Sequence, residues 1–279
     1  MKWYELSSMF APRAIAFCDF DKTCRPYDGA VSPQVVAAMQ RLTAKDVMVV
    51  IVSGQSAQLT CGYFAAHGLD AKGRPPFSKF IIAGENGGFL LDYNLGPLAF
   101  ADEYPNLASE IRQLAHVIEA RLHNRGFADW RYKGMNAGGL ATFTTTIPAS
   151  TKSGTWPHLK RTVEAVLKEP AFANQFFTIY HERPWGDGRT IDIGVLEPDT
   201  KVWAVQKIWE RYGKAHSYYI GDGINDLRAM QIVTSVGGRI ACPQDSHSTV
   251  LEYVRAVNGH ICSRTNGDAV VEFLDAITL

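Results

Sequence analysis

Two aspartates separated by one residue, Asp19 and Asp21, stand at the end of an apolar run at residues 14–20, and Thr23 follows them. Carboxylates at the end of a buried strand can both turn toward one crevice. One can then attack a phosphorus atom while the other protonates the leaving oxygen. The same spacing also occurs in ordinary turns and in incidental metal sites, so the pair alone leaves those readings open.

Two further polar positions have a similar setting. Ser53 and Gly54 end the apolar run at residues 47–52. A hydroxyl and a backbone N–H at such a place can hold a phosphoryl oxygen, or the serine can cap the next helix, a role that Ser56 can also fill. Lys201 stands at the start of an expected helix, where a cation opposes the helix dipole and favours an anionic partner. A solvated lysine is the simpler alternative.

The segment from Gly221 to Asp226 gives the strongest of these signals. It holds two carboxylates, Asp222 and Asp226, together with an asparagine and two glycines. Carboxylate oxygens suit a hard cation such as Mg²⁺, and glycines permit a tight turn. An ordinary acidic helix N-terminus is the alternative interpretation.

The elements that must position these groups alternate along the chain. Continuous apolar runs predict buried strands, and capped or amphipathic segments predict helices between them. The expected strands are 14–20, 47–52, 79–84 and 217–221, and the expected helices are 33–45, 56–67, one from about Asp199 and one from about Asn225. This alternation predicts an α/β fold, a Rossmann-like parallel sheet with helices on both faces. Such sheets place ligand sites at the C-terminal ends of their strands, where the polar segments fall.

The middle of the chain has a different pattern. It combines amphipathic helices with a threonine-rich alternating strand, as in a half-exposed antiparallel sheet. The expected elements are helices at 105–124 and 156–168 and strands at 140–148, 176–181 and 189–195. We therefore predict an α/β core of residues 1–92 and 196–279, with an α+β domain of residues 93–195 inserted into it.

Composition excludes several classes of function. The 279 residues include 28 basic and 28 acidic side chains, which gives no basic footprint for nucleic acid. No apolar run approaches the roughly 18 residues of a membrane span, and residues 1–13 lack a signal-peptide pattern. The five cysteines show no Cys-x-x-Cys pair and the eight histidines no ligand spacing, so we expect neither a disulfide framework nor a zinc site. These features predict a cytoplasmic protein with a small-molecule partner, without nucleic-acid or membrane partners, and leave its oligomeric state open.

Taken in order, the four segments resemble the motifs of the haloacid dehalogenase superfamily of phosphotransferases. The motifs are Asp-x-Asp-x-Thr at 19–23, the strand-ending Ser53, Lys201, and Gly-Asp-Gly-x-Asn-Asp at 221–226. Together they span most of the chain. The resemblance implies the core fold of that superfamily, a bound Mg²⁺ and a covalent aspartyl-phosphate intermediate.

The resemblance also implies a role for each matching residue. Asp19 would be the nucleophile and a metal ligand, and Asp21 the general acid and base, with its backbone carbonyl on the metal. Ser53 and Lys201 would hold phosphoryl oxygens, with the Gly54 N–H beside them. Asp222 would bind the metal, and Asp226 would bind it too or orient its waters.

An insert between Ser53 and Lys201 resembles the second cap type of this superfamily. That type occurs in phosphatases of sucrose- and trehalose-phosphate and in phosphomannomutase, and such a lid would close over the substrate and exclude water. Lys22 stands where many of these sugar phosphatases have glycine. Gln55 stands where arginine is frequent. Both positions depart from the sucrose and trehalose patterns.

The pattern is more similar to that of the kanosamine-6-phosphate phosphatases, which are amino-sugar phosphatases of the same cap type. The similar segments are Phe17 to Asp21, Arg131 to Lys133, and Gly186-Asp187 ahead of Asp192. In the insert, polar residues are candidate contacts to sugar or phosphate, with plain surface charge as the alternative. These candidates are Arg131, Lys133, Asn136, Arg183 and Asp187.

The sequence thus predicts an Mg²⁺-dependent phosphomonoesterase of small phosphorylated metabolites, with a sugar or amino-sugar phosphate of the hexose 6-phosphate type as substrate. A phosphomutase with the same nucleophile is the alternative, and it would need a second anion clamp in the insert. A non-catalytic binding module is disfavoured, because such a module has no need for both Asp19 and Asp21.

Overall fold

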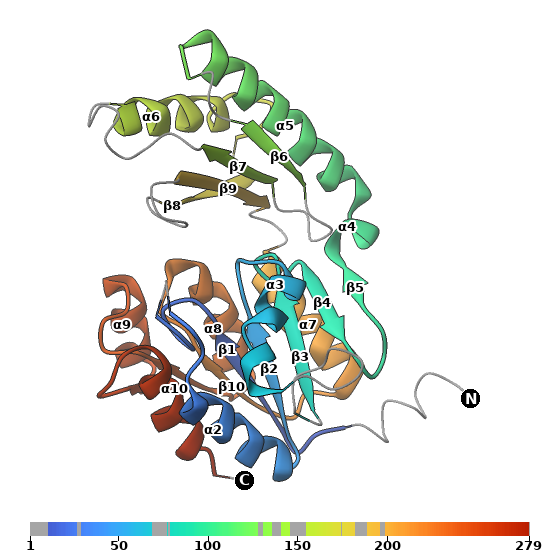
Figure 1. Cartoon of the computed structure of the whole chain (residues 1–279), viewed down its shortest axis with the longest axis vertical. Coiled ribbons are helices and arrows are strands. Elements are labelled where there is room, and N and C mark those ends of the chain that lie inside the picture. Colours follow the sequence, from blue (N-terminus) through green and yellow to red (C-terminus); the bar gives the residue numbers. More distant parts are fainter. Residues whose placement is uncertain are drawn as a thin grey trace. The chain divides into compact units, whose positions relative to one another are not determined.

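The computed structural model describes residues 11–26, 29–68, 77, 79–127, 131–135, 141–145, 155–173, 175–181, 189–195 and 199–278. The chain forms two compact units, Met1–Leu98 with Lys201–Leu279, and Ala99–Thr200 (Figure 1). The domain boundaries expected from the sequence, after residues 92 and 195, fall slightly earlier than these divisions after Leu98 and Thr200.

The first unit is built on a sheet with the strand order β12-β11-β10-β1-β2-β3-β4-β5. Its strands are β1 (Ala14–Asp19), β2 (Val47–Val52), β3 (Phe80–Gly84), β4 (Phe89–Asp92), β5 (Leu98–Ala99), β10 (His216–Ile220), β11 (Arg239–Cys242) and β12 (His260–Ile261). Neighbouring strands from β12 to β3 run parallel, and β4 runs antiparallel to β3. The predicted α/β fold with a parallel sheet is confirmed.

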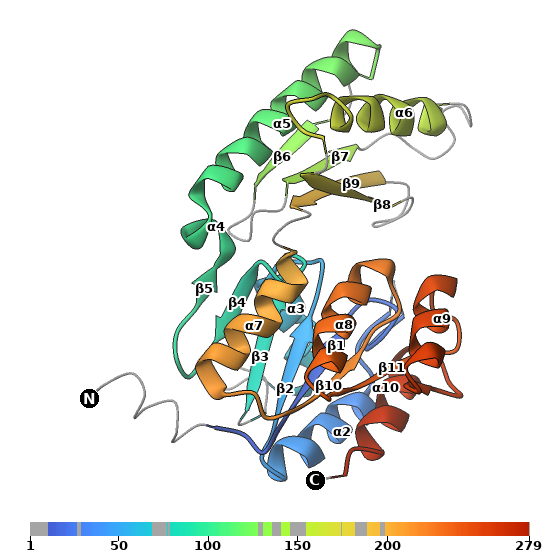
Figure 2. The ribbon, with the colours of Figure 1, turned by 180° about the vertical axis from the view of Figure 1, so that it is seen from behind.

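Helices cover both faces of this sheet. Helices α2 (Pro33–Ala44), α3 (Ala57–Gly62) and α10 (Asn266–Asp275) lie on the face seen in Figure 1, and α7 (Thr200–Tyr212) and α8 (Leu227–Ser235) on the face seen in Figure 2. Helix α9 (Ser248–Ala256) packs against β11 and β12. Every residue of β1 and of β2 is buried, which explains why both strands are continuous apolar runs in the sequence.

The register of the central strands determines where the polar segments meet. Strand β1 lies between β10 and β2, with Cys18 opposite Ile220 and Asp19 opposite Val52. Since these strands are parallel, the residues that follow them emerge at the same edge of the sheet. Asp19 therefore lies beside the segments that begin at Ser53 and at Gly221.

Two helices differ from the sequence prediction. The prediction of one continuous helix over 56–67 is wrong, because α3 ends at Gly62 and a separate 3₁₀ turn spans Ala65–His67. Glycine weakens the helix there, and Phe64 is fully buried against the rings of Phe20 and Phe80, with centroids 6.1 and 5.4 Å away. The helix expected from Asn225 likewise starts later, as α8, after a 3₁₀ turn at Ile224–Asp226.

The second unit is an antiparallel sheet with helices. Its strands β6 (Arg131–Met135), β7 (Ala141–Thr145), β8 (Phe176–His181) and β9 (Arg189–Val195) have the order β6-β7-β9-β8. The helices are α4 (Phe100–Glu103), α5 (Pro105–Asn124) and α6 (Thr155–Leu167). One stripe of α5 is fully buried, as its period predicts: Ile111, Leu114, Ile118 and Leu122. Strand β6 was not predicted, because Arg-Tyr-Lys-Gly-Met has no apolar alternation.

In the described part of the chain, no helix is both long enough and apolar enough to cross a membrane.

Candidate active site

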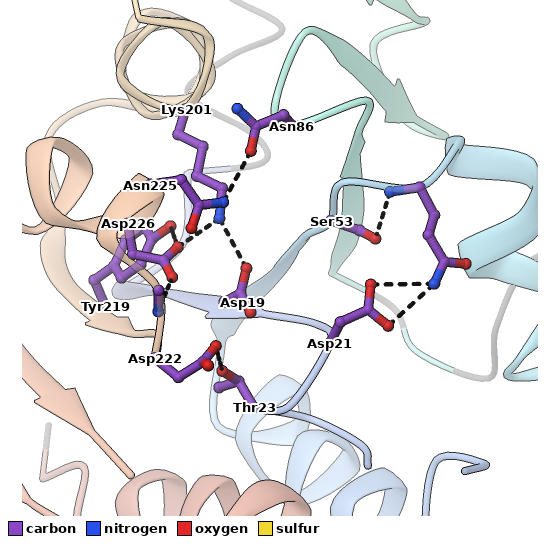
Figure 3. A network of polar contacts seen from close by, with 12 residues as sticks. Asp19, Asp21, Thr23, Ser53, Asn86, Lys201, Tyr219, Asp222, Asn225 and Asp226 are labelled. Atoms are coloured by element: carbon purple, nitrogen blue, oxygen red, sulfur yellow. Dashed lines mark hydrogen bonds and ion pairs between the residues drawn. The ribbon is translucent and has the colours of Figure 1, made fainter. Parts of the chain in front are cut away.

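The centre of the site is the buried ammonium group of Lys201. Lys201 stands in the first turn of α7, and its Nζ donates hydrogen bonds to Asp19 Oδ1 at 2.8 Å and to Asp226 Oδ1 at 2.6 Å (Figure 3). Its side chain has no exposed surface. The three residues come from positions 19, 201 and 226 of the chain, so the structure brings together three of the predicted site residues.

Asp226 is the most enclosed of the carboxylates. Besides Lys201, its Oδ1 accepts from the Tyr219 hydroxyl at 2.7 Å, and its Oδ2 accepts from the Gly223 N–H at 3.0 Å. A Cβ on Gly221 would lie 2.5 Å from Asp226 Cγ, so only glycine lets this carboxylate fold back under the turn. Three donors already satisfy Asp226, which suits an anchor for Lys201 better than a direct metal ligand.

Asp222 completes the acidic cluster, the name used below for Asp19, Asp222 and Asp226. One carboxylate oxygen from each lies within 4.8 Å of the others. The Asp222 Oδ1 accepts from Thr23 Oγ1 at 3.1 Å, which ties the end of the first motif to the last. Thr23 is fully buried, so this bond connects the two loops inside the unit.

The acidic cluster carries more negative than positive charge. Burial, and then the neighbouring Asp226, raise the pKa of Asp19 well above its usual range, although Lys201 opposes the shift. Burial and Asp226 also raise the pKa of Asp222 to about 6. Burial alone would lower the pKa of Lys201, but the carboxylates of Asp19 and Asp226 give it a net increase. When all three carboxylates are ionised, the single ammonium leaves two negative charges uncompensated among these four groups, which together with burial is why the carboxylates resist ionisation without a further cation.

This excess of negative charge fits a divalent cation. Oxygen ligands at close range are what Mg²⁺ requires, and a charge of +2 would balance the three carboxylates and the lysine. Asp19 and Asp222 are the residues that would hold the ion. Asp226 would act through Lys201, because its oxygens already accept three hydrogen bonds.

Ser53 follows β2 at the same edge of the sheet. It is fully buried, and its Oγ accepts from the Gln55 N–H at 3.0 Å. Ser56, rather than Ser53, caps α3 by accepting from the Leu59 N–H at 3.2 Å. The helix-cap role that the sequence left open for Ser53 is therefore filled by Ser56. Gly54 follows Ser53 in the loop and is exposed.

Asp21 belongs to a different set of contacts, although it is only two residues from Asp19. Its carboxylate accepts from Arg25 Nη2 at 2.5 Å. It also accepts from Gln55 Nε2 at 3.0 and 3.1 Å, the two dashed lines from Asp21 in Figure 3. Arg25 is itself buried, with its guanidinium over the rings of Phe20 and Tyr63 at 5.1 and 4.1 Å. Arg25 and Gln55 thus hold the side chain of the predicted acid and base, and below they are called the Asp21 clamp.

Lys22, which lies between Asp21 and Thr23, has an unusual backbone conformation. Lys22 has a φ of 62°, in the left-handed region that favours glycine. A bulky side chain here costs about 1 kcal/mol or more.

The predicted contacts in the insert are only partly described. Arg131 and Lys133 lie on β6. Asn136, Arg183 and Asp187 lie outside the described residues. The substrate-binding role of these positions remains a prediction.

The sequence interpretation missed Arg25 and Tyr219. Arg25 had no motif to mark it, and Tyr219 looked like any buried strand residue. Asn225 belongs to the predicted last motif, and its Nδ2 donates to Asn86 Oδ1 in the β3–β4 turn at 3.2 Å. The glycine-rich Glu-Asn-Gly-Gly sequence had marked this turn as a candidate for the cleft, and Glu85 and Asn86 have positive φ values of 56° and 55°.

Neither a scan of protein-family models nor a search of curated proteins gives a match. Solved structures do match. A haloacid dehalogenase-like hydrolase from Bacteroides thetaiotaomicron is 14% identical, with a TM-score of 0.58 over 96% of this chain and 100% of that one. A putative HAD/COF-like hydrolase from Plasmodium vivax is 15% identical, with a TM-score of 0.58 over 98% of each chain. A Thermotoga maritima protein is 15% identical, with a TM-score of 0.60 over 96% and 98%. The chain therefore has the fold of the haloacid dehalogenase-like hydrolases.

Proposed function

We propose that this protein is an Mg²⁺-dependent phosphatase that hydrolyses a small phosphorylated metabolite through an aspartyl-phosphate on Asp19. The observation that carries the proposal is the Asp19 carboxylate, held by Lys201 at 2.8 Å within a buried cluster that has excess negative charge. A merely structural ion pair needs one carboxylate for one lysine. This arrangement has three.

Charge is the first obstacle to attack by a carboxylate on a phosphate ester. Mg²⁺, when bound, would neutralise the phosphoryl oxygens and the developing charge of a loose transition state. Lys201 is bound to Asp19 and Asp226 and would hold a phosphoryl oxygen from the same position. Its bond to Asp226 aims the ammonium group, which reduces the reorganisation needed in the transition state.

The two steps use the two aspartates of the first motif. An oxygen of Asp19 forms a bond to phosphorus as the ester P–O bond breaks, and protonated Asp21 gives its proton to the leaving oxygen. Asp21 then takes a proton from water, whose oxygen attacks phosphorus and releases Asp19 and inorganic phosphate. Because Arg25 and Gln55 occupy the Asp21 carboxylate, proton transfer requires Asp21 to exchange at least one of these bonds.

A sugar or amino-sugar phosphate is the proposed substrate class. The support is the motif pattern shared with amino-sugar phosphatases and the polar residues of the insert, among them Arg131 and Lys133 on β6. If these side chains bind substrate, alanine at either position should raise KM and leave kcat nearly unchanged.

A screen of hexose and hexosamine 6-phosphates for release of inorganic phosphate tests the proposal. We expect release from at least one sugar phosphate with Mg²⁺, and none after chelation or in the Asp19→Asn variant. Phosphate release that is unaffected by chelation, or a product that is an isomeric sugar phosphate, would contradict it.

A further inference from the structure

A second group of potential metal ligands lies in the first unit, apart from the acidic cluster. His260 is on β12, Cys262 follows that strand, and Glu272 is on α10. One ligand atom from each of the three residues lies within 4.8 Å of the others. These residues take no part in the proposed phosphatase mechanism, and they are called the His-Cys-Glu site below.

The carboxylate of Glu272 is held in place before any ion binds. It accepts from the Ser263 N–H at 3.0 Å on both oxygens and from Ser263 Oγ at 2.8 Å, and its Oε1 lies 2.9 Å from His260 Nε2. Ligating carboxylates in proteins are commonly oriented by such hydrogen bonds from neighbouring groups. These four contacts fill the lone-pair sites of the carboxylate, so a cation would bind Oε1 in place of the contact to His260 Nε2, whose imidazole would turn to the ion as well.

The sulfur of Cys262 lies at the inner side of the group. Cys262 is 1% exposed, and its Sγ donates to the Ala269 carbonyl at 3.4 Å. Its ligand atom lies within 4.8 Å of those of His260 and Glu272, and a cation bound there would displace the thiol proton to solvent.

Two of the three residues in the group are open to solvent. The side chains of His260 and Glu272 are 47% and 27% exposed, so an ion can reach them from solvent. Tetrahedral bonds of about 2.0–2.3 Å place ligand atoms about 3.4 Å apart. Rotation of the exposed imidazole and small shifts of the carboxylate can close a group that already lies within 4.8 Å to that separation.

We infer that His260, Cys262 and Glu272 form a binding site for a borderline divalent cation of the Zn²⁺ type. The combination of one sulfur, one imidazole nitrogen and one carboxylate oxygen matches the ligands of Zn²⁺ and is unsuited to Mg²⁺. Three protein ligands leave a fourth position for water. By joining β12 to α10, the ion would fasten the C-terminal helix to the edge of the sheet.

Titration of the intact protein with Co²⁺, a spectroscopic substitute for Zn²⁺, tests this inference directly. Thiolate coordination produces an intense sulfur-to-cobalt charge-transfer absorption, and the oxygen ligands of the acidic cluster cannot produce it. We expect this absorption to saturate at about one equivalent and to disappear when Zn²⁺ is added. Loss of one ligand should weaken binding more than the roughly 10–100-fold that loss of a neighbouring hydrogen-bond partner costs.

Matched variants separate this site from other cysteines. Cys262→Ser should abolish the absorption, and His260→Ala should weaken Co²⁺ binding at least about 100-fold. Cys61→Ser, a change at another buried thiol on α3, should leave it intact. Each variant's thermal unfolding establishes that it is folded, and phosphatase activity with Mg²⁺ should be unchanged in all three. Absence of the absorption in the unaltered protein, or its persistence in Cys262→Ser, would overturn the inference.

Discussion

The two aspartates of the first motif lie in opposite electrostatic settings. Asp19 shares a single ammonium group with Asp226, and Asp222 adds a third carboxylate within 4.8 Å. Asp21 instead receives hydrogen bonds from a buried arginine and an amide. Around Asp19, three carboxylates share one ammonium group. The charge of Asp21, in contrast, is balanced by the guanidinium group of Arg25.

The difference indicates a division of labour. A carboxylate whose neighbourhood is short of positive charge attracts a cation, which suits the residue that must meet a phosphate. A carboxylate matched by its own clamp is held in a defined position until a ligand changes its contacts. Two residues of the same type, separated by one position, thus acquire different roles from their surroundings.

Removal of the ammonium group that Asp19 and Asp226 share should have the largest effect on stability and activity. Lys201→Met leaves the buried Asp19 and Asp226 without their ammonium partner, so the metal-free protein should lose about 3–5 kcal/mol of unfolding free energy. Activity should fall by at least about 100-fold, because a preorganised donor is lost. Urea unfolding and steady-state kinetics measure the two effects.

The control is another lysine of the same helix. Lys207 pairs with Glu210 at 2.8 Å near the surface, and Lys207→Met should change stability by no more than about 0.5 kcal/mol. Equal losses in the two variants would show that the buried ammonium has no special role.

The role of Asp21 can be separated from that of Asp19 by the choice of leaving group. Asp21→Asn should slow hydrolysis of an alkyl or sugar phosphate by about 100-fold or more, because the leaving alkoxide needs a proton. The loss should be smaller with p-nitrophenyl phosphate, whose leaving group departs without protonation. A parallel comparison of kcat for the two substrates measures this, and identical losses count against the acid role.

The location of the proposed catalytic groups could largely be predicted from the sequence, whereas the Asp21 clamp could not. Asp19, Ser53 and Asp222 follow apolar runs, and parallel strands bring such positions to one edge. Lys201 is marked by its place in the first turn of a helix.

The clamp depends on packing that no local pattern records. Arg25 is buried with its guanidinium over the rings of Phe20 and Tyr63, and Tyr63 directly follows the last residue of α3. The proposed His-Cys-Glu site also depends on packing. His260 and Cys262 are neighbours in sequence, but the partner Glu272 comes close only because α10 folds back beside β12.

A weaker change tests the clamp itself. Gln55→Ala removes the hydrogen bonds from Nε2 to Asp21 and leaves the bond from Arg25 in place. We expect kcat to fall by roughly tenfold, the scale of one hydrogen bond to a charged group, with KM nearly constant. Gln55→Glu is the matched variant of equal size, and it should be worse than alanine because it places a second carboxylate against Asp21. A glutamate variant with unaltered kcat would show that the clamp does not control Asp21.

The smallest expected effect is a pH dependence of stability that arises from the acidic cluster. The pKa of Asp222 in the folded protein is about 6, above its ordinary value of 3.8, so the folded state binds this proton more tightly than the unfolded state. The stability that this group contributes is therefore complete below about pH 4 and is lost as pH rises through about 6. Metal-free urea unfolding should show this slope, and Asp222→Asn should flatten it. Saturating Mg²⁺ should also flatten it, and a slope that Asp222→Asn leaves unchanged would assign it to another group.

Direct detection of phosphate on Asp19 is the most decisive measurement. The protein is mixed with substrate and Mg²⁺, quenched in acid during turnover, digested, and its peptides are mapped by mass spectrometry. The mechanism predicts a phosphorylated peptide whose modification lies on Asp19 and which is absent from Asp19→Asn. Its yield should increase in Asp21→Asn with p-nitrophenyl phosphate, since the base for the second step is missing. Turnover with no phosphorylated peptide in either protein, or a modification on another residue, would contradict the assignment of Asp19 as nucleophile.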